Sequence, residues 1–405
     1  MRSRSSRRHF LLRAAQLGLA STLAACAPST ASLVISSKVA LSGEFLALEA
    51  KPPLKLLHSN LPVPEPTLDM KIGQMLLTGF RGQFLSENSR VLGEIRDYHI
   101  GGVVLFGGNV SSPDQVQTLT QTLQDAAAHT LLIAIDQEGG QVMRLDRRFG
   151  ITTNYSAQAL GQMNDMAKTT AEAELFAQTL ASLGINLNLA PVVDLNLNPY
   201  NPVIGALGRS FSADPAIVTS QAKTFIEAHH KYNTYCTLKH FPGHGSSHND
   251  THWGFVDVTD SWKESELAPY HELIKAGACD VIMTAHIFNG KLDAKLPATL
   301  SQAIVTGILR ERLGYDGVVI SDDMQMRAIS KYYDFPTAIQ FAIEAGIDIL
   351  AIANNVAYQE TVAIRAAKII RGLVDSGKIS EARINQSYER IMRLKAGLPA
   401  PTNHS

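Results

Sequence analysis

The segment Asp250-Thr251-His252 places a carboxylate two residues before an imidazole. In an extended backbone, residues i and i+2 point to the same side, so the Asp can accept a hydrogen bond from one ring nitrogen and fix the tautomer. A histidine held in this way can give a proton to a leaving group and later take one from water. The pair therefore predicts a general acid/base site.

A second candidate lies further along the chain, where Asp322 and Asp323 directly follow the apolar run Gly317–Ser321. A carboxylate at this place could act as a nucleophile or could stabilise developing positive charge. Adjacent residues in extended backbone point to opposite sides, so one Asp is expected to face the site while the other supports it. The spacing does not say which Asp takes which role.

Three cationic side chains lie near predicted strand ends or in loops, namely Arg144, Arg209 and Lys239. A lone Arg or Lys is usually a solvated surface residue. In a site for a hydroxyl-rich ligand these cations could instead hold hydroxyl groups or hold Asp136 in place. Arg144 follows Asp136 by eight residues across a Gly-Gly turn, so the loop between them can fold back.

Histidine recurs at every fourth position in one segment, at His240, His244, His248 and His252. On a helix this spacing would stack four imidazoles as a possible metal site. Pro and Gly residues within the segment disfavour a helix, so the spacing is interpreted as accidental. A loop could still gather two of these histidines around a metal, with Asp136, Asp322 or His286 as further ligands. Metal-dependent hydrolysis is therefore the alternative.

The elements that position these residues are indicated by a repeating pattern. Eight short apolar runs are typical of strands buried on both faces of a parallel sheet. They are Met75–Phe80, Gly102–Phe106, Leu131–Asp136, Asn186–Ala190, Thr237–Phe241, Val281–His286, Gly317–Ser321 and Asp348–Ala353. Helical patterns lie between and after them, at Pro113–Ala128, Thr169–Leu183, Pro215–Lys231, Trp262–Ala276, Ser301–Leu313, Pro336–Ala345, Val356–Asp375 and Ser380–Lys395.

Eight parallel strands, each followed by a helix, predict an α/β fold, a TIM-type (β/α)8 barrel forming a single catalytic domain. One miscounted strand would allow a doubly wound sheet instead. In a barrel the active site lies at the carboxyl ends of the strands. Polar residues follow six of the runs, including Asp136, Asp194, His240, His286, Asp322 and Asn354. Helix capping explains one such residue but not six in register.

These segments resemble glycoside hydrolase family 3, and within it the bacterial β-N-acetylglucosaminidases that act on cell-wall muropeptides. The resemblance covers roughly residues 68–397. Its motifs are Asp136-x-Glu138-Gly139-Gly140-x-Val142-x-Arg144, Gly208-Arg209-Ser210-Phe211, Lys239-His240-Phe241-Pro242-Gly243-His244-Gly245, Asp250-Thr251-His252 and Ser321-Asp322-Asp323-Met324.

The resemblance implies a retaining mechanism through a covalent glycosyl-enzyme. Asp322 matches the family's nucleophile, and His252, paired with Asp250, matches its acid/base residue. Residues that match its sugar-binding positions are Asp136, Arg144, Arg209, Lys239 and His240. It implies a carbohydrate substrate and no metal or organic cofactor. A family 3 β-glucosidase-like hydrolase of another β-glycoside is the nearest alternative, and a non-catalytic wall-binding lipoprotein is a further one.

Composition limits the remaining possibilities. The chain has 405 residues, of which 45% are hydrophobic and 18% charged, as in globular proteins. The first 25 residues hold five Arg and no acid, so the rest of the chain is net negative, which argues against nucleic acid as a partner. Three cysteines exclude a disulfide scaffold, and Cys236 and Cys279 are expected to be buried free thiols. We expect a monomer.

The N-terminal segment is interpreted as an export signal. Arg7-Arg8 and the apolar run after them look like a twin-arginine signal over residues 1–25, and Leu23-Ala24-Ala25-Cys26 resembles a bacterial lipobox. Cleavage would leave a lipidated Cys26 followed by a flexible tether over residues 26–66, the barrel over 67–397 and a tail over 398–405. The prediction is a periplasmic protein anchored by lipid to a membrane, with Ala27 favouring the outer membrane.

Overall fold

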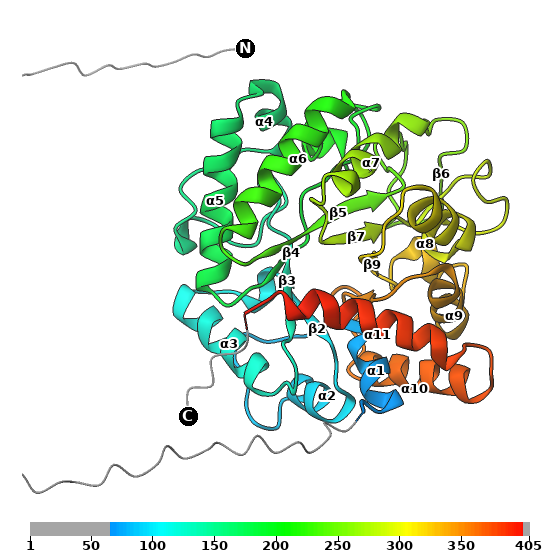
Figure 1. Cartoon of the computed structure of the whole chain (residues 1–405). Helices are drawn as coiled ribbons and strands as arrows, with labels where there is room; N and C mark the ends of the chain where they lie inside the picture. The colour runs from blue at the N-terminus through cyan, green and yellow to red at the C-terminus, as the bar shows by residue number, and fades with distance from the viewer. Residues whose placement is uncertain (1–64, 400–405) are drawn as a thin grey trace, which may run out of the picture. The chain divides into compact units, whose positions relative to one another are not determined.

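The computed structural model describes residues 65–399, and its helices and strands run from Leu68 to Ala396 (Figure 1). The predicted export signal, Cys26, most of the tether and most of the tail lie outside the described residues. Within residues 65–399, no helix combines the length and the apolar character needed to cross a membrane.

The centre of the fold is one parallel sheet of eight strands in the order β10-β1-β2-β3-β4-β5-β7-β9. An isolated parallel bridge between Ile320 and Ile349 joins β9 to the segment that enters β10, and this bridge closes the sheet into a barrel. The predicted barrel is confirmed, and the doubly wound alternative is wrong. The strands are β1 Leu76–Gly79, β2 Gly102–Leu105, β3 Leu132–Ile135, β4 Leu187–Asn188, β5 Tyr235–Phe241, β7 Val281–Thr284, β9 Val318–Ser321 and β10 Leu350–Ile352.

Each predicted apolar run overlaps one barrel strand. β5 begins two residues before its run, at Tyr235, and β4 covers only part of its run. It is two residues long, because Pro191 has no N–H with which to extend the ladder, and pairing resumes at the bridge between Val192 and Lys239. Two further strands, β6 Val256–Asp257 and β8 Ile287–Phe288, pair in parallel outside the barrel. They were not predicted, since two residues are too few to give an apolar-run signal.

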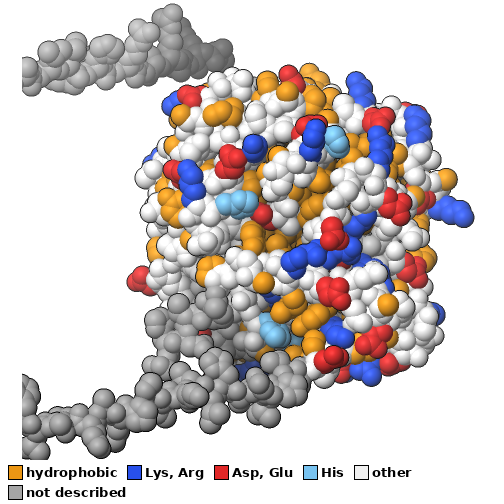
Figure 2. Space-filling view, viewed as in Figure 1, with side chains coloured by type: hydrophobic (Ala, Val, Ile, Leu, Met, Phe, Trp, Pro, Cys, Tyr) orange, Lys and Arg blue, Asp and Glu red, His pale blue; other side chains and the backbone are white. Residues whose placement is uncertain are grey.

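Helices surround the barrel, and the charged side chains on the face shown in Figure 2 are of both signs and interspersed. The helices are α1 Leu68–Gln74, α2 Arg90–Tyr98, α3 Pro113–Asp125, α4 Ala157–Met163, α5 Met166–Ser182, α6 Pro215–His230, α7 Ala268–Lys275, the π-helix η6 Ala303–Arg312, α8 Arg327–Ser330, α9 Phe335–Ala345, α10 Val362–Asp375 and α11 Glu381–Ala396. Short 3-10 turns add η1 Gly107–Asn109, η2 Arg147–Phe149, η3 Gly205–Leu207, η4 Glu264–Leu267 and η5 Ala298–Leu300.

Two predicted helix boundaries were wrong. The helix predicted from Val356 begins at Val362, and Val356 lies 98% exposed in the preceding loop. The helix predicted from Trp262 is a 3-10 turn, η4, followed by α7, whose Pro269 occupies the first turn, where a missing N–H costs nothing. Asp214 caps α6, because its Oδ1 accepts a hydrogen bond from the Ala216 N–H at 2.8 Å.

The two cysteines of the barrel are both free thiols, as expected. Cys236 lies on β5 and is buried, and Cys279 is half-buried just before β7. Burial raises the pKa of both thiols well above the usual range, with the nearby charge of Asp280 adding to the effect. Neither thiol is therefore ionised near neutral pH.

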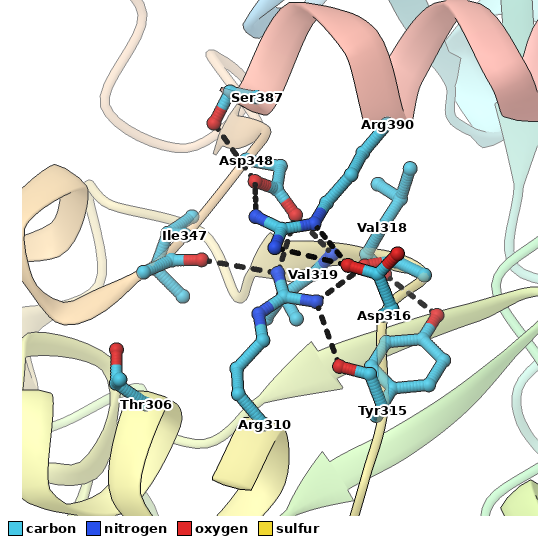
Figure 3. Close-up of polar contacts among 12 residues, drawn as sticks. Thr306, Arg310, Tyr315, Asp316, Val318, Val319, Ile347, Asp348, Ser387 and Arg390 are labelled. Atoms are coloured by element: carbon cyan, nitrogen blue, oxygen red, sulfur yellow. Dashed lines mark hydrogen bonds and ion pairs between the residues drawn. The ribbon is translucent and has the colours of Figure 1, made fainter. Parts of the chain in front are cut away.

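A buried ionic network lies where β10 begins, at the end of the barrel opposite to the carboxyl ends of the strands. Figure 3 shows its contacts. Asp348, just before β10, accepts hydrogen bonds from Arg310 Nη2 of η6 at 2.6 Å and from the Val319 N–H of β9 at 3.0 Å. Its other oxygen accepts hydrogen bonds from Ser387 Oγ at 2.8 Å and Arg390 Nη1 at 3.4 Å, both on α11. One carboxylate thus joins η6, β9 and the last helix.

Replacing Asp348 by Ala (D348A) is expected to lower the free energy of unfolding by about 3–5 kcal/mol, because buried guanidinium groups lose their counter-charge. Urea unfolding measures this loss. The matched control is D316A: Asp316 also pairs with Arg390, but its side chain is 68% exposed, so that loss should stay below about 1 kcal/mol. Equal losses in the two variants would contradict the proposed importance of burial.

Candidate active site

The barrel brings the predicted site residues to the carboxyl ends of its strands. Asp136 directly follows β3, Lys239 and His240 lie on β5, and Asp322 directly follows β9. Segments more than a hundred residues apart meet here, since Lys239 Nζ donates a hydrogen bond to Asp136 Oδ1 at 2.9 Å. This is the end of the barrel at which the sequence placed the chemistry.

Five charged side chains form an alternating chain at this end. Arg144 Nη2 lies 3.0 Å from Asp136 Oδ2, and Lys239 Nζ bridges Asp136 Oδ1 at 2.9 Å and Glu138 Oε1 at 2.7 Å. Arg209 then binds Glu138 through two hydrogen bonds of 2.8 Å, from Nε and Nη2. In space the charges therefore alternate in the order Arg144, Asp136, Lys239, Glu138 and Arg209, although the sequence order is different.

The network keeps its buried members charged. Burial by itself would raise the pKa of Glu138, but the charges of Arg209 and Lys239 outweigh it and hold that pKa well below the usual range. Burial likewise favours neutral Lys239, yet the charges of Asp136 and Glu138 raise its pKa above the ordinary value. The ammonium and the carboxylate are therefore fixed in place before any ligand arrives, which is the preorganisation that a polar ligand site needs.

The predicted fold-back of Arg144 onto Asp136 is confirmed. Gly139 and Val142 form an antiparallel bridge, and Gly139 adopts a φ of 91°, a left-handed conformation that glycine tolerates without strain. A Cβ at Gly139 would also come within 2.5 Å of the Tyr155 carbonyl oxygen. The tight turn that this glycine permits returns Arg144 to the carboxylate eight residues before it.

Arg209 does not hold Asp136, contrary to one of the two expected roles. Its Nε and Nη2 bind Glu138, and its Nη1 donates to the Val203 carbonyl oxygen at 2.7 Å. Arg144 and Lys239 hold Asp136 instead. Direct contact of Arg209 with a sugar stays a prediction, and its observed contacts position Glu138.

His240 is oriented by Asp194, a carboxylate with no exposed side-chain surface. Asp194 Oδ2 lies 2.7 Å from His240 Nδ1, and its Oδ1 accepts backbone N–H groups of His240 at 3.1 Å and His244 at 2.7 Å. Burial would raise the pKa of Asp194, but the charge and hydrogen bond of His240 lower it below the ordinary value. With Nδ1 engaged, Nε2 is the ring nitrogen of His240 left for a ligand.

The dyad predicted from Asp250 and His252 is present. Asp250 Oδ1 lies 2.7 Å from His252 Nδ1 and accepts the His252 backbone N–H at 2.8 Å. The imidazole is 61% exposed, so its Nε2 can meet a ligand from solvent. The loop is fastened to α8 because the Ala328 N–H donates to the Thr251 carbonyl oxygen at 3.2 Å.

Asp322 and Asp323 divide their roles as expected. Asp323 Oδ1 accepts the backbone N–H groups of Gln325 at 3.1 Å and Ala353 at 2.9 Å, so this carboxylate braces the two loops after β9 and β10. Burial raises the pKa of Asp323 to about 6.

The histidines of the site lower the pKa of Asp322. Burial would raise its pKa, but the charges of His286 and His240, followed by the Asp323 N–H bond and the charge of His252, hold the pKa below the ordinary value. The Asp323 N–H donates to Asp322 Oδ1 at 2.8 Å. Asp322 is therefore ionised at neutral pH, which a nucleophilic carboxylate requires.

The four-residue histidine spacing does not build a metal site. The segment forms no helix, and His240 and His244 meet edge to face with ring centroids 5.9 Å apart. Burial lowers the pKa of His244 to about 4, and its Nδ1 lies 2.8 Å from Ser247 Oγ. Across residues 65–399, no three His, Cys, Asp or Glu side chains group as metal ligands, so the metal-dependent alternative gains no candidate ligand set there.

Glu266 lies buried beneath the loop that leads to the dyad. Its Oε2 accepts the Gly245 N–H at 3.0 Å, whereas its Oε1 and the buried Ser246 Oγ have no hydrogen-bond partner within 3.5 Å. Burial raises the pKa of Glu266 to about 7, although the bond it accepts from the Gly245 N–H acts in the opposite direction. This carboxyl is thus close to half-protonated at neutral pH.

Replacing Glu266 by Gln (E266Q) is expected to stabilise the protein more at pH 8 than at pH 5. The folded carboxyl binds its proton up to about pH 7 whereas a solvated one releases it near pH 4.5, so wild-type stability falls as pH rises through this window. The Gln side chain never ionises and avoids that cost. Melting temperatures of both proteins at the two pH values test this, and an equal difference at both would contradict it.

The glycosyl hydrolase family 3 N terminal domain matches residues 67–394, nearly the whole barrel. The chain belongs to glycosyl hydrolase family 3. Family membership accounts for the barrel and for the position of its candidate site.

The chain is also similar to individual proteins and to solved structures. Beta-hexosaminidase A of Pseudoalteromonas piscicida is 36% identical over 83% of this chain and 62% of its own, and a beta-hexosaminidase of Tolumonas auensis is 38% identical over 64% and 78%. The structure of a family 3 beta-N-acetylglucosaminidase from Paenibacillus sp. str. FPU-7 is 37% identical with a TM-score of 0.77, covering 82% of this chain and 62% of its own. This chain thus spans less than two thirds of the Pseudoalteromonas and Paenibacillus proteins.

Three residues that the structure places at or beside the candidate site were not among the candidates from sequence. Glu138 could have been found as a second acid two residues after Asp136, on the same side of an extended segment. Asp194 was noted at a strand end but was given no role. Glu266 carries no signal, because it lies on a 3-10 turn and becomes relevant only through its contact with Gly245.

Proposed function

We propose that this protein is a retaining exo-β-N-acetylglucosaminidase that removes terminal β-linked N-acetylglucosamine through a covalent glycosyl-enzyme. The observation that carries the proposal is the pairing of an exposed imidazole, His252, with Asp250 at the same barrel end as the ionised Asp322. Similarity to hexosaminidases in sequence and in structure supports the sugar class.

In the first step, Asp322 attacks the anomeric carbon while His252 gives a proton to the departing oxygen. The carbon–oxygen bond to the leaving group breaks as the bond to the carboxylate forms. Asp250 holds Nδ1 and so presents Nε2 to the leaving group.

In the second step, His252 takes a proton from water, and the resulting hydroxide equivalent displaces Asp322 from the anomeric carbon. Two displacements at one carbon return the original configuration, and His252 regains the proton it gave away. The network of Asp136, Lys239 and Glu138 supplies charged hydrogen-bonding groups, fixed beforehand, for the hydroxyls of the terminal sugar.

The substrate proposed for this reaction is a peptidoglycan fragment with a terminal N-acetylglucosamine. The resemblance of the motifs to muropeptide-cleaving relatives supports it, as does the export signal read in residues 1–25. A family 3 β-glucosidase-like activity on another β-glycoside is the alternative to be tested.

The reaction is tested by comparing an aryl β-N-acetylglucosaminide with the matching aryl β-glucoside, with a chelator present. The expected result is a strong preference for the N-acetyl sugar, followed by release of N-acetylglucosamine from purified muropeptides. Preference for the glucoside would favour the β-glucosidase alternative. If activity is lost in the chelator and restored by added metal, that result would favour metal-dependent hydrolysis.

We also propose that the protein is exported through the twin-arginine route and anchored by lipid on Cys26. The supporting features are Arg7-Arg8, the apolar run after them and the Leu23–Cys26 motif. Metabolic labelling with a fatty acid should mark the full chain and should not mark a C26A variant. Label on both proteins would contradict the assignment.

A further inference from the structure

The loop that carries the acid/base dyad is held in place at one buried residue. Within residues 248–255 Thr251 alone is buried, whereas Asp250 is half-buried and His252 is exposed. The residue between the two members of the dyad therefore faces the protein, while the imidazole of the dyad faces solvent. Contacts made by Thr251 thus decide where this exposed loop lies.

Two groups of Thr251 contact different parts of the barrel end. Its carbonyl oxygen accepts the Ala328 N–H of α8 at 3.2 Å, and α8 follows β9 and Asp322 along the chain. Its side-chain Oγ1 lies 3.3 Å from Nε2 of His244, which follows β5. The backbone of Thr251 is therefore tied to the loop that holds the nucleophile, and its side chain is tied to the end of β5.

His244 is a fixed point to which the loop can be attached. Its backbone N–H donates to Asp194 Oδ1 at 2.7 Å, and its carbonyl oxygen accepts a hydrogen bond from Asn201 Nδ2 at 2.7 Å. The residue is 2% exposed, so its ring cannot turn into solvent. Both ends of the His244 peptide units are thus bonded to the segment that follows β4.

The ring of His244 contacts two hydroxyl groups, one at each nitrogen. Its Nδ1 lies 2.8 Å from Ser247 Oγ, and its Nε2 faces Thr251. Burial lowers the pKa of the ring to about 4, so at neutral pH one nitrogen carries a hydrogen and the other a free lone pair. A hydroxyl can donate or accept, so the two hydroxyl groups complement the neutral ring in either tautomer.

We propose that Thr251 is a positioning residue for the acid/base step, and that its hydroxyl, held by His244 and Ser247, places His252 at the bond to be cleaved. The inference rests on the proposed function and adds to it a residue that acts through His252. Without the hydroxyl the loop keeps its bond to Ala328 but can shift at the side-chain contact. A displacement of about 1 Å can slow a reaction about 100-fold.

The test compares two substrates that differ in their need for a proton, methyl β-N-acetylglucosaminide and a dinitrophenyl β-N-acetylglucosaminide. T251V keeps the branched shape of the side chain and loses the hydroxyl. In the full chain, this variant is expected to lower kcat/KM on the methyl glycoside by about 10- to 100-fold. The loss on the dinitrophenyl glycoside should stay below about threefold, because that leaving group departs without a proton. T251S regains the hydroxyl and is expected to come within about threefold of wild type on the methyl glycoside.

The matched control is T120V on α3. Thr120 is 3% exposed, like Thr251, and its Oγ1 donates to the Leu183 carbonyl oxygen at 2.7 Å. T120V therefore loses a buried hydroxyl in the same way, but away from the dyad. It is expected to leave the ratio of the two kcat/KM values as in wild type, whatever its melting temperature.

S247A tests the same chain of contacts from its other end. It is expected to lower kcat/KM on the methyl glycoside alone, by about threefold, because the His244 ring loses one of its two partners. Added to T251V, it should cause no further loss, since the ring then no longer holds the loop. Additive losses in the double variant would contradict a shared route through His244.

The outcomes separate the positioning role from the proposed function. An equal loss on both substrates in T251V would show that the whole site had moved, and it would overturn the positioning role. An unchanged methyl activity in T251V, or a loss that T251S does not restore, would overturn it as well. If T251V does not fold, an unchanged ratio in S247A would do the same. Failure of the wild-type protein to cleave either glycoside would overturn the proposed function, and the positioning role with it.

Discussion

Replacing Asp322 by Asn (D322N) is expected to abolish turnover, lowering kcat by about four orders of magnitude or more on every β-N-acetylglucosaminide. An amide oxygen is a poor nucleophile, and no ester with the sugar can form. The structure supports the choice, because Asp322 is the carboxylate held ionised by the histidine charges and by the Asp323 N–H. Steady-state kinetics on an activated aryl glycoside measures the loss.

The neighbouring carboxylate supplies the control. Both hydrogen bonds that brace Asp323 end on its Oδ1, so an Asn in D323N can accept them unchanged through its amide oxygen. D323N is expected to stay within about tenfold of wild-type kcat, since its role is to position and not to react. Activity of D322N at the level of D323N would remove Asp322 as the nucleophile. Trapping of a labelled sugar on Asp322 in wild type would identify the ester directly.

Replacing His252 by Ala (H252A) is expected to slow glycosides in proportion to the basicity of the leaving group. For methyl β-N-acetylglucosaminide, kcat/KM should fall by about 10³-fold, within the range that a positioned general acid contributes. For a dinitrophenyl glycoside the loss in kcat/KM should be below about tenfold, because that leaving group departs without a proton. The ratio kcat/KM is the proper measure, since it reports the first step alone.

His248 provides the matched control for this variant. It lies on the same loop, is exposed, and its Nδ1 contacts Asn198 Nδ2 at 3.3 Å away from the dyad. H248A is expected to change both kcat/KM values by less than about threefold. An equal loss on methyl and dinitrophenyl glycosides in H252A would show that His252 is not the proton donor.

Local spacing was sufficient for part of this site. The pairing of Asp250 with His252 and the return of Arg144 to Asp136 follow from short separations and a Gly-Gly turn, so sequence predicts them. The barrel was also predictable, because a strand buried on both faces leaves a continuous apolar run in the sequence.

Contacts between distant segments could not be predicted. Arg209 and Glu138 are 71 positions apart, and His240 and Asp194 are 46 apart, so the choice of partner depends on strand order and register. The sequence predicts that Arg209 lies in the site and allows it two roles. The strand register then determines that the carboxylate it binds is Glu138. The strands β6 and β8 were missed for the same reason. They pair over only two residues each, and this pairing depends on where the fold positions the loop after β5.

The contacts of Asp348 imply an order of events during synthesis. The hydrogen bonds to Ser387 and Arg390 bind the segment before β10 to the last helix, so the edge between β9 and β10, where the barrel closes, gains its full ionic support only after residues 381–396 have emerged. A nascent chain ending before that helix would hold a buried carboxylate short of its partners, a costly state. We therefore expect chains that end before α11 to lack a native-like barrel and to be cleaved by proteases more readily than the full chain.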